Sequence, residues 1–201
     1  ATDGTASITD TFDIVIANTN DAPTLATAQA DETATEDTAY SVDVSGNFAD
    51  VDVGDSLTYT ATGMPSTMTM STAGVLSGTP LNADVGTSTV VVTATDGTAS
   101  ITDTFDIVIA NTNDAPTLAT AQADVTADED SPYSLDVSGN FADVDVGDSL
   151  TYTATGMPST MAMSTAGVLS GTPLNADVGS YTVVVTATDG TASITDTFDI
   201  V

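Results

Sequence analysis

The chain has 201 residues, of which 29 are acidic, and it contains no Lys, Arg or His, so its formal net charge at pH 7 is -29. Because phosphate backbones and anionic lipids are normally bound through Lys and Arg, this composition excludes nucleic acid and direct membrane contact. The usual nucleophile and base pairs of enzymes need His, Cys or Lys, and Cys is absent as well. The sequence therefore predicts that the chain is not an enzyme.

Oxygen atoms are the metal ligands that this composition leaves, since soft metals depend on Cys and His. Oxygen sites rich in Asp and Asn suit calcium, which is available at millimolar concentration outside cells. No apolar run approaches the ~20 residues of a membrane-spanning helix. We therefore expect calcium as the cofactor and an extracellular location, either on the cell surface or secreted.

An internal repeat organises the chain. The segment ATDGTASITDTFDIV begins at residues 1, 94 and 187, which gives a period of 93 residues. This period is too long for a solenoid unit and fits a sandwich domain with its own core. We expect the last two strands of a preceding repeat in residues 1–19, a complete repeat in 20–112, and a second repeat, truncated in its last strand, in 113–201.

The N-terminal segment, residues 1–15, is expected to form a β-hairpin. Its apolar residues Ile8, Phe12 and Ile14, followed by Ile16, match the inward row of the next copy of the motif. An isolated hairpin with a bare apolar face is marginal in water. We therefore expect it to pack on protein other than residues 20–201, either because the array is longer or because strands are donated between molecules.

Within each period, short β-branched segments are separated by Gly, Pro, Asn and Asp, and no helical periodicity is present. Apolar residues alternate with polar ones over 40–44, 57–61 and 104–109, as in half-buried strands. Further strands are predicted at 68–70, 75–79 and 87–95, with a tight turn over the STAG sequence at 71–74. About seven strands result, each expected to be part of an all-β two-sheet sandwich.

Acidic side chains gather in two kinds of loop. The sequence FADVDVGDS places Asp50, Asp52 and Asp55 within six residues, and NTNDAP begins at Asn111. Carboxylates this close repel one another, and a loop that keeps them together usually holds a cation, although a solvated turn is the alternative. A helical calcium loop is excluded, because Ala61 stands where the closing Glu would be needed.

These motifs carry a resemblance. The sequence VVVTATDGTASITDTFDIVIANTNDAP resembles the end of a cadherin repeat that runs through its calcium linker into the next repeat, and ADVDVGDSLTY resembles the early DxD loop and following strand. The chain is most similar to the cadherin-like, dystroglycan-type repeats of large bacterial surface proteins and adhesins. The resemblance implies tandem seven-stranded Ig/cadherin-like β-sandwiches in a linear array, with calcium at each junction.

The resemblance also implies the ligands of each junction. The central junction would use Glu36, Asn82, Asp84, Asn111, Asn113, Asp114, Asp143, Asp145, Asp148 and Asp189. The preceding junction would use Asn18, Asn20, Asp21, Asp50, Asp52, Asp55 and Asp96. Asn82 departs from the acidic residue usual at its position. Acids outside these sets, such as Asp31, Asp43, Asp106 and Asp124, are expected on the solvated surface, and Asp37 and Asp130 fit either group.

The leading interpretation is a calcium-rigidified stalk or spacer of an extracellular adhesin or surface fibre, whose partners are the neighbouring repeats of the same array. One alternative is a subunit of a self-assembling extracellular filament, in which identical chains contact each other through strands or surfaces. A second is a carbohydrate- or surface-binding module that uses Thr-rich strands such as 92–95, although Thr is common in strands for its β-propensity alone. Adaptation to high salt could also explain acidity, but not its concentration in the junction loops.

Overall fold

A computed structural model describes residues 1–2 and 4–201 of the chain. The chain forms two compact units. The first consists of Ala1–Thr33, Ala39–Thr79 and Thr87–Val108, and the second of Ala34–Thr38, Pro80–Gly86 and Ile109–Val201. Strands dominate both units, which confirms the all-β prediction. Among the described residues, no helix is long and apolar enough to cross a membrane.

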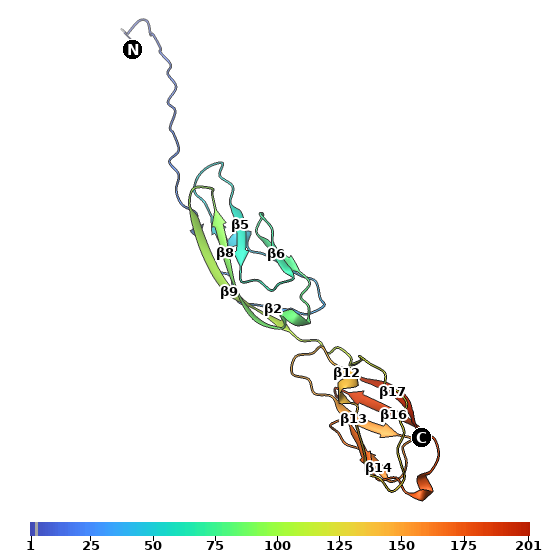
Figure 1. Cartoon of the computed structure of the whole chain (residues 1–201). Coiled ribbons are helices and arrows are strands. Elements are labelled where there is room, and N and C mark those ends of the chain that lie inside the picture. The colour runs from blue at the N-terminus through green and yellow to red at the C-terminus, as the bar shows by residue number, and fades with distance from the viewer. Residues whose placement is uncertain (3) are drawn as a thin grey trace. The chain divides into compact units, whose positions relative to one another are not determined.

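The first repeat forms two facing sheets and a short strand pair (Figure 1). Its strands are β1 (Thr24–Leu25), β2 (Glu32–Thr35), β3 (Tyr40–Asp43), β4 (Phe48–Ala49), β5 (Thr58–Thr62), β6 (Met68–Met70), β7 (Val75–Gly78), β8 (Gly86–Thr95) and β9 (Ser100–Ala110). One sheet has the order β2-β9-β8-β5, the other has the order β3-β7-β6, and β1 pairs with β4. The expected strands at 68–70, 75–79 and 87–95 are therefore present, within one residue at each end.

The second repeat has the same plan. Its strands are β10 (Thr117–Leu118), β11 (Tyr133–Asp136), β12 (Phe141–Ala142), β13 (Thr151–Thr155), β14 (Met161–Met163), β15 (Val168–Gly171), β16 (Tyr181–Thr188) and β17 (Ser193–Ile200). The sheets have the orders β13-β16-β17 and β11-β15-β14, and β10 pairs with β12. Where the first repeat has β2, the second has a single parallel bridge from Val125 to Ile200.

Short 3-10 turns interrupt the strands in both repeats, although we expected strands and loops alone. They are η1 (Ser45–Asn47), η2 (Asn82–Asp84), η3 (Ser138–Asn140) and η4 (Asn175–Asp177). The η2 turn is closed by its own sequence, because the Asp84 carboxylate accepts a hydrogen bond from the Leu81 backbone N–H at 3.2 Å. Turns of three residues are too short to produce a helical period in the sequence.

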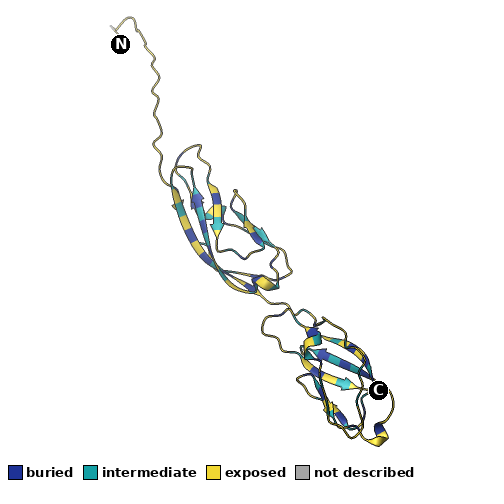
Figure 2. Ribbon diagram, viewed as in Figure 1, coloured by how far each residue is buried: buried dark blue, intermediate teal, exposed yellow. Residues whose placement is uncertain are grey.

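Alternating burial along the strands builds the core of each sandwich, as Figure 2 shows for β9. Phe105, Ile107 and Ile109 are buried, whereas Thr104 before them and Val108 between them are exposed. The alternation over 104–109 therefore predicted the inward face correctly. The tight turn at 71–74 is also confirmed, since the Gly74 N–H donates to the Ser71 carbonyl at 3.0 Å.

The described residues of the N-terminal segment, 1–2 and 4–15, form no strand of either sandwich. Thr2 and Ser7 make one antiparallel bridge, and Phe12 is 79% exposed together with its apolar neighbours Ile8, Ile14 and Ile16. Residue 3, inside the expected hairpin, lies outside the described residues. The segment is not folded back on residues 20–201, so its packing on other protein stays a prediction.

Candidate metal centres

The acidic loop after β12 is organised by hydrogen bonds that its own carboxylates accept. The Asp145 N–H donates to Asp143 Oδ1 at 3.0 Å, and the Asp148 N–H donates to the Asp145 carbonyl at 3.3 Å. This short turn brings three carboxylates together, and Asp145 is only 5% exposed. Burial of a carboxylate in a chain without basic residues needs donors or a cation from elsewhere.

Sequence-distant stretches of the second unit supply some of those donors. The amide Nδ2 of Asn82 donates to Asp145 Oδ1 at 2.8 Å, and the Asp114 N–H donates to Asp145 Oδ2 at 2.8 Å. Asn82 precedes β8 in the chain, and Asp114 lies between β9 and β10. Both stretches therefore contact the acidic loop through hydrogen bonds to the Asp145 carboxylate.

Glu36 is the most deeply buried acid near this point, with 1% of its surface exposed. Its Oε1 accepts a hydrogen bond from the Thr112 N–H at 2.5 Å, but its Oε2 is buried without a partner among the described residues. One polar atom of the Asn111 amide lies 3.1 Å from Glu36 Oε1 and 3.2 Å from Asp145 Oδ1. If that atom is nitrogen, it donates to both carboxylates; if it is oxygen, three oxygens converge as they do around a cation.

A second group of carboxylates adjoins the same loop. Asp143, Asp148 and Asp189 each offer one oxygen, and these oxygens lie within 4.8 Å of one another. Asp143 Oδ2 is buried and has no partner in the described part of the chain. Asn113 Nδ2 donates to Asp189 Oδ2 at 3.0 Å. The loop therefore presents one buried carboxylate oxygen, Asp143 Oδ2, without a described partner.

The pKa values of this group move in opposite directions. Burial raises the pKa of Asp148 above its usual range, and the negative charges of Asp145, Asp143 and Asp189 raise it further. The pKa of Asp189 is lowered, mainly because its carboxylate accepts hydrogen bonds from the Ala192 and Thr191 N–H groups. The protein therefore disfavours the charged form of Asp148 and favours that of Asp189.

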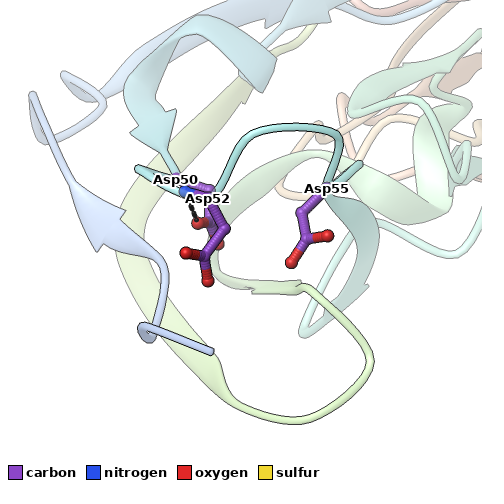
Figure 3. A group of neighbouring side chains, drawn as sticks. All are labelled: Asp50, Asp52 and Asp55. Carbon is purple, nitrogen blue, oxygen red and sulfur yellow. Dashed lines mark hydrogen bonds between the residues drawn. The ribbon is translucent and has the colours of Figure 1, made fainter. Parts of the chain in front are cut away.

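The first unit repeats the arrangement (Figure 3). Asp50, Asp52 and Asp55 place one oxygen each within 4.8 Å of one another, and Asp50 Oδ2 is buried without a described partner. The Asp21 N–H donates to Asp52 Oδ2 at 2.7 Å, as its counterpart does to Asp145. Asn20 Nδ2 donates to Asp96 Oδ2 at 3.1 Å.

Most of the residues expected at the two junctions are thus gathered in two clusters, one in each unit. Two differ. Asp84 is buried and closes the η2 turn, whereas Asn82 beside it reaches the cluster around Asp145. Asn18 lies in the exposed N-terminal segment, before the clustered residues. Asp37 and Asp130, which fitted either group, have φ of 56° and 61°, the left-handed region that Asp tolerates in turns.

The buried acids on the last strand of each repeat were not predicted from the sequence. Asp103 and Asp196 are buried, and their Oδ2 atoms accept hydrogen bonds from the Gln29 and Gln122 N–H groups, both at 2.6 Å. The alternation along the strand could have revealed them, because Asp103 lies on the inward face of β9 with Phe105 and Ile107. Asp31 and Asp124, expected on the solvated surface, also accept backbone hydrogen bonds, from the Asp106 and Asp199 N–H groups at 2.9 Å.

The donor set of both clusters fits a hard divalent cation. Every side chain offered is a carboxylate or an amide, and calcium takes six to eight such oxygens. The buried oxygens that lack partners, Oε2 of Glu36 and Oδ2 of Asp50 and Asp143, are what a cation would satisfy. In the second unit, Glu36, Asn111 and Asp145 would hold such an ion at one point and Asp143, Asp148 and Asp189 at another. In the first unit, Asp50, Asp52 and Asp55 would hold one.

Both repeats match a known protein family. The family model described as "Putative Ig domain" matches residues 22–110 and 115–201. The serine-rich adhesin for platelets of Staphylococcus aureus, strain MRSA252, is 35% identical over 150 residues, which are 70% of this chain and 10% of that protein. The chain thus spans a small part of this curated relative.

Solved structures share the fold. Chicken VE-cadherin EC1-2 aligns with 84% of this chain and 95% of its own, with a TM-score of 0.52 and 14% identity. Human protocadherin-24 EC1-2 aligns with 90% of this chain and 97% of its own, with a TM-score of 0.50 and 15% identity. Since the family model covers most of both repeats, the chain belongs to the Ig-domain family that it describes, as two tandem cadherin-like β-sandwich domains.

Proposed function

We propose that the chain is a calcium-stiffened spacer of an extracellular adhesin and that it has no catalytic activity of its own. The observation that carries the proposal is Glu36, a 1% exposed carboxylate with an unpartnered oxygen in a chain that has no basic side chain to pair with it. Burial of a carboxylate oxygen that has neither a hydrogen-bond donor nor a cation beside it costs free energy. A bound divalent cation removes that cost.

The position of the cluster explains what such an ion would do. Glu36 comes from the stretch after β2, Asn111 from the segment after β9, and Asp145 from the loop after β12. Ligands this far apart in sequence are free to separate in the absence of the ion. An ion bound by all of them favours the assembled arrangement by mass action and so stiffens the segment 111–116 that joins the repeats.

The relatives support the setting. A 150-residue part of a staphylococcal serine-rich adhesin is 35% identical to this chain. We accordingly assign this chain to the surface of a cell or to a secreted fibre, where calcium is abundant and where repeated domains extend reach. Its partners are the neighbouring repeats of its own array.

The test is calcium titration by calorimetry, with small-angle scattering before and after chelation. Calcium should bind at the second-unit cluster, and its removal should change the scattering profile by loosening the segment 111–116. Glu36→Gln removes the buried charge and keeps the side-chain size, and should weaken binding at least about tenfold because affinity follows ligand charge. Glu129→Gln is the matched control, since Glu129 occupies the same position of the second repeat and is exposed.

Equal losses in the two variants would show that Glu36 acts only through net charge and not as a ligand. If the native chain bound no calcium at millimolar concentration, and chelation changed neither the scattering profile nor the melting temperature, the stiffened-spacer proposal would be wrong.

A further inference from the structure

The sequence that leaves the first sandwich occurs twice in the chain. Residues 1–31 and 94–124 are identical, so the N-terminal segment carries a second copy of β9 and of the residues that follow it. Ile16 corresponds to Ile109 in β9. Ile109 is 1% exposed, whereas Ile16 is 89% exposed in the N-terminal segment, which is yellow in Figure 2. The same residue is therefore buried in one copy of the sequence and exposed in the other.

The end of the first repeat shows how this sequence is held when it is buried. Ile109 belongs to the same compact unit as Ala34–Thr38 and Pro80–Gly86. The Glu36 N–H donates to the Ala110 carbonyl at 3.1 Å. The chain is therefore fixed to the stretch after β2 at the point where it leaves β9.

The second repeat has a cavity of about 380 Å³ at the corresponding end. Its lining includes residues 127–129, 177–179 and 200–201, which correspond to 34–36, 84–86 and 107–108 of the first repeat. Val201 in this lining corresponds to Val108, the residue directly before Ile109. Glu129 is exposed here, whereas its counterpart Glu36 is buried. The cavity therefore lies where the first repeat holds the residues that follow Val108.

We propose that a second copy of this chain fills this cavity with Ile16 and Ala17, and that its residues 7–15 take the place of β17. The position of Ile16 requires this exchange, because Ile16 directly follows Val15, and Val15 corresponds to Val201. Residues 7–14 have the same sequence as β17, so the replacement keeps every pairing that β17 makes with β16. Association through a strand that another molecule adds to a sheet is a recurring mode of protein recognition.

The free energy of association comes from the residues beyond the exchanged strand. One strand is released for each identical strand that binds. The burial of Phe12, which is 79% exposed, is therefore offset by the exposure of Phe198, which is 2% exposed before the exchange. Ile16 has no counterpart in the released strand, and its burial removes apolar surface from water without an opposing loss.

The exchange also brings together two surfaces whose counterparts already meet in the second unit. There, Asn82 Nδ2 donates to Asp145 Oδ1 at 2.8 Å. The corresponding residues are Asn175, which is exposed at the end of the second repeat, and Asp52 in the acidic loop of the first. In the assembly, Asn175 of one copy donates to Asp52 of the next. Each contact uses a different end of each copy, so it repeats head to tail as in an open filament.

Disulfide cross-linking tests the exchange directly, since the chain has no Cys of its own. Thr182 lies opposite Asp199, and its Oγ1 donates to Asp199 Oδ1 at 2.8 Å. Asp13 corresponds to Asp199, so Asp13→Cys/Thr182→Cys should give a ladder of dimers and longer products on non-reducing electrophoresis. Residues opposite each other in antiparallel strands have Cβ atoms about 4.5–5.5 Å apart, close to the spacing of a disulfide. Because β17 must detach first, the ladder should form slowly and faster on warming.

The matched control for the cross-link is Asp13→Cys/Thr89→Cys. Thr89 has the position of Thr182 in the first repeat, and its Oγ1 donates to Asp106 Oδ1 at 2.7 Å. Displacement of β9 gains nothing, because β9 itself already continues into Ile109 and Ala110. The control should therefore give little cross-linked product under the same conditions.

Sedimentation velocity of the whole chain measures the contribution of the cavity. Ile16→Asp places a charge in the cavity and should weaken assembly at least about tenfold, because an unpaired buried charge is costly. Val15→Asp adds the same charge one residue earlier, where the counterpart Val108 is 39% exposed, and should assemble nearly as well as the native chain. Both positions are exposed in the monomer, and circular dichroism melts check that both variants remain folded.

A native chain that stays monomeric at millimolar concentration after incubation near its melting temperature, in calcium and in chelator, overturns the proposal. Equal cross-linking of the two cysteine pairs does so as well, and so does an equal loss of assembly in the two aspartate variants. Calcium binding without assembly would remove this inference and leave the spacer proposal standing. Glu129 is exposed in the monomer, so its use as the control for calcium titration applies at dilutions where the chain is monomeric.

Discussion

Asp103 lies in the inward row of β9, and its two carboxylate oxygens accept hydrogen bonds from the backbone N–H groups of Gln29 and Thr104, at 2.6 and 2.9 Å. A buried acceptor of this kind fixes the loop before β2 to the last strand of the sandwich. Asp196 does the same for Gln122 and Thr197 in the second repeat, at 2.6 and 2.9 Å. Both oxygens of each of these acids accept backbone hydrogen bonds, whereas Glu36 Oε2 has no partner among the described residues.

We predict that Asp103→Ala destabilises the first sandwich by about 1–3 kcal/mol, because it leaves the partly buried Gln29 N–H without its acceptor. Urea unfolding followed by circular dichroism measures the change. Asp10→Ala is the matched control, since Asp10 occupies the same motif position in the exposed N-terminal segment. Loss of stability in the control as large as in Asp103→Ala would show that the strand motif, and not the buried hydrogen bond, is responsible.

We predict that Asp148→Asn changes the melting temperature in opposite directions in chelator and in calcium. Its pKa is raised by burial first and then by the neighbouring carboxylates, so the folded state disfavours its charged form at neutral pH. The resulting penalty is present above the raised pKa and is relieved as pH falls through it. In chelator, Asp148→Asn should therefore raise the melting temperature at pH 7, and the gain should shrink as pH falls.

With calcium present the same substitution should lower the melting temperature relative to the native chain, because it removes a charged oxygen ligand. Differential scanning calorimetry at pH 7 in calcium and in chelator provides the comparison. The same direction of change in both conditions would mean that Asp148 is not a ligand. Asp55→Asn tests the counterpart in the first unit.

At the scale of elements, alternation of apolar and polar residues predicted the strands that are long enough to show it. β3, β5 and β9 were located from alternating residues, and β8 from a β-branched run. β1 and β4, with their counterparts β10 and β12, consist of two residues each and have no period to detect. Their pairing, Thr24 with Ala49 and Leu25 with Phe48, is set by the folded sandwich and not by local sequence.

The candidate sites were likewise predictable where their residues are close together in the sequence. Asp50, Asp52 and Asp55 were predictable because they are close in sequence, and their carboxylates do meet. The deep burial of Glu36 was not, because it depends on the backbone of Thr112, far along the chain. Local spacing thus identified the loops, whereas burial and the partners of each oxygen required the fold.

Gly63 directly follows β5, and its backbone conformation restricts which residues can replace it. Its φ is +73°, and a Cβ at this position would overlap the carbonyl oxygen of Thr89 on β8. Gly63→Ala should therefore cost about 1–2 kcal/mol for the left-handed backbone and a further 1–3 kcal/mol or so for the overlap. Gly54→Ala is the control, because Gly54 has a φ of +104° with nothing within 4 Å of the added Cβ.

Chemical unfolding of the two glycine variants separates strain from overlap. Gly63→Ala should lower the denaturation midpoint more than Gly54→Ala does. Equal midpoints would mean that β5 and β8 shift apart at no cost, and that the close approach of these strands is not required for the sheet.

At the scale of the whole molecule, a formal charge of -29 without one basic side chain opposes folding at low ionic strength. Simple salt reduces this repulsion by shortening the Debye length from ~10 Å at 0.1 M to ~3 Å at 1 M. A cation bound at Glu36 and its neighbours acts in a different way, because it binds a defined set of oxygens in the folded state alone. Adaptation to salt and specific calcium binding therefore predict different responses.

We predict that the melting temperature in chelator rises steadily as sodium chloride increases from 0.02 to 0.5 M or so, as screening requires. Millimolar calcium at matched ionic strength should raise it further and should saturate, following the one-site stabilisation RT ln(1 + [L]/Kd), which is about 2.7 kcal/mol at a hundredfold excess over Kd. Magnesium at the same concentration should raise it less, because magnesium demands a tighter octahedral shell and gives up its water reluctantly. Scanning calorimetry of the native chain, with Glu36→Gln measured alongside, separates the two effects: the variant should keep the response to sodium chloride and lose most of the additional response to calcium. Identical melting curves in calcium and in sodium chloride of equal ionic strength would leave screening as the sole effect of ions on this chain.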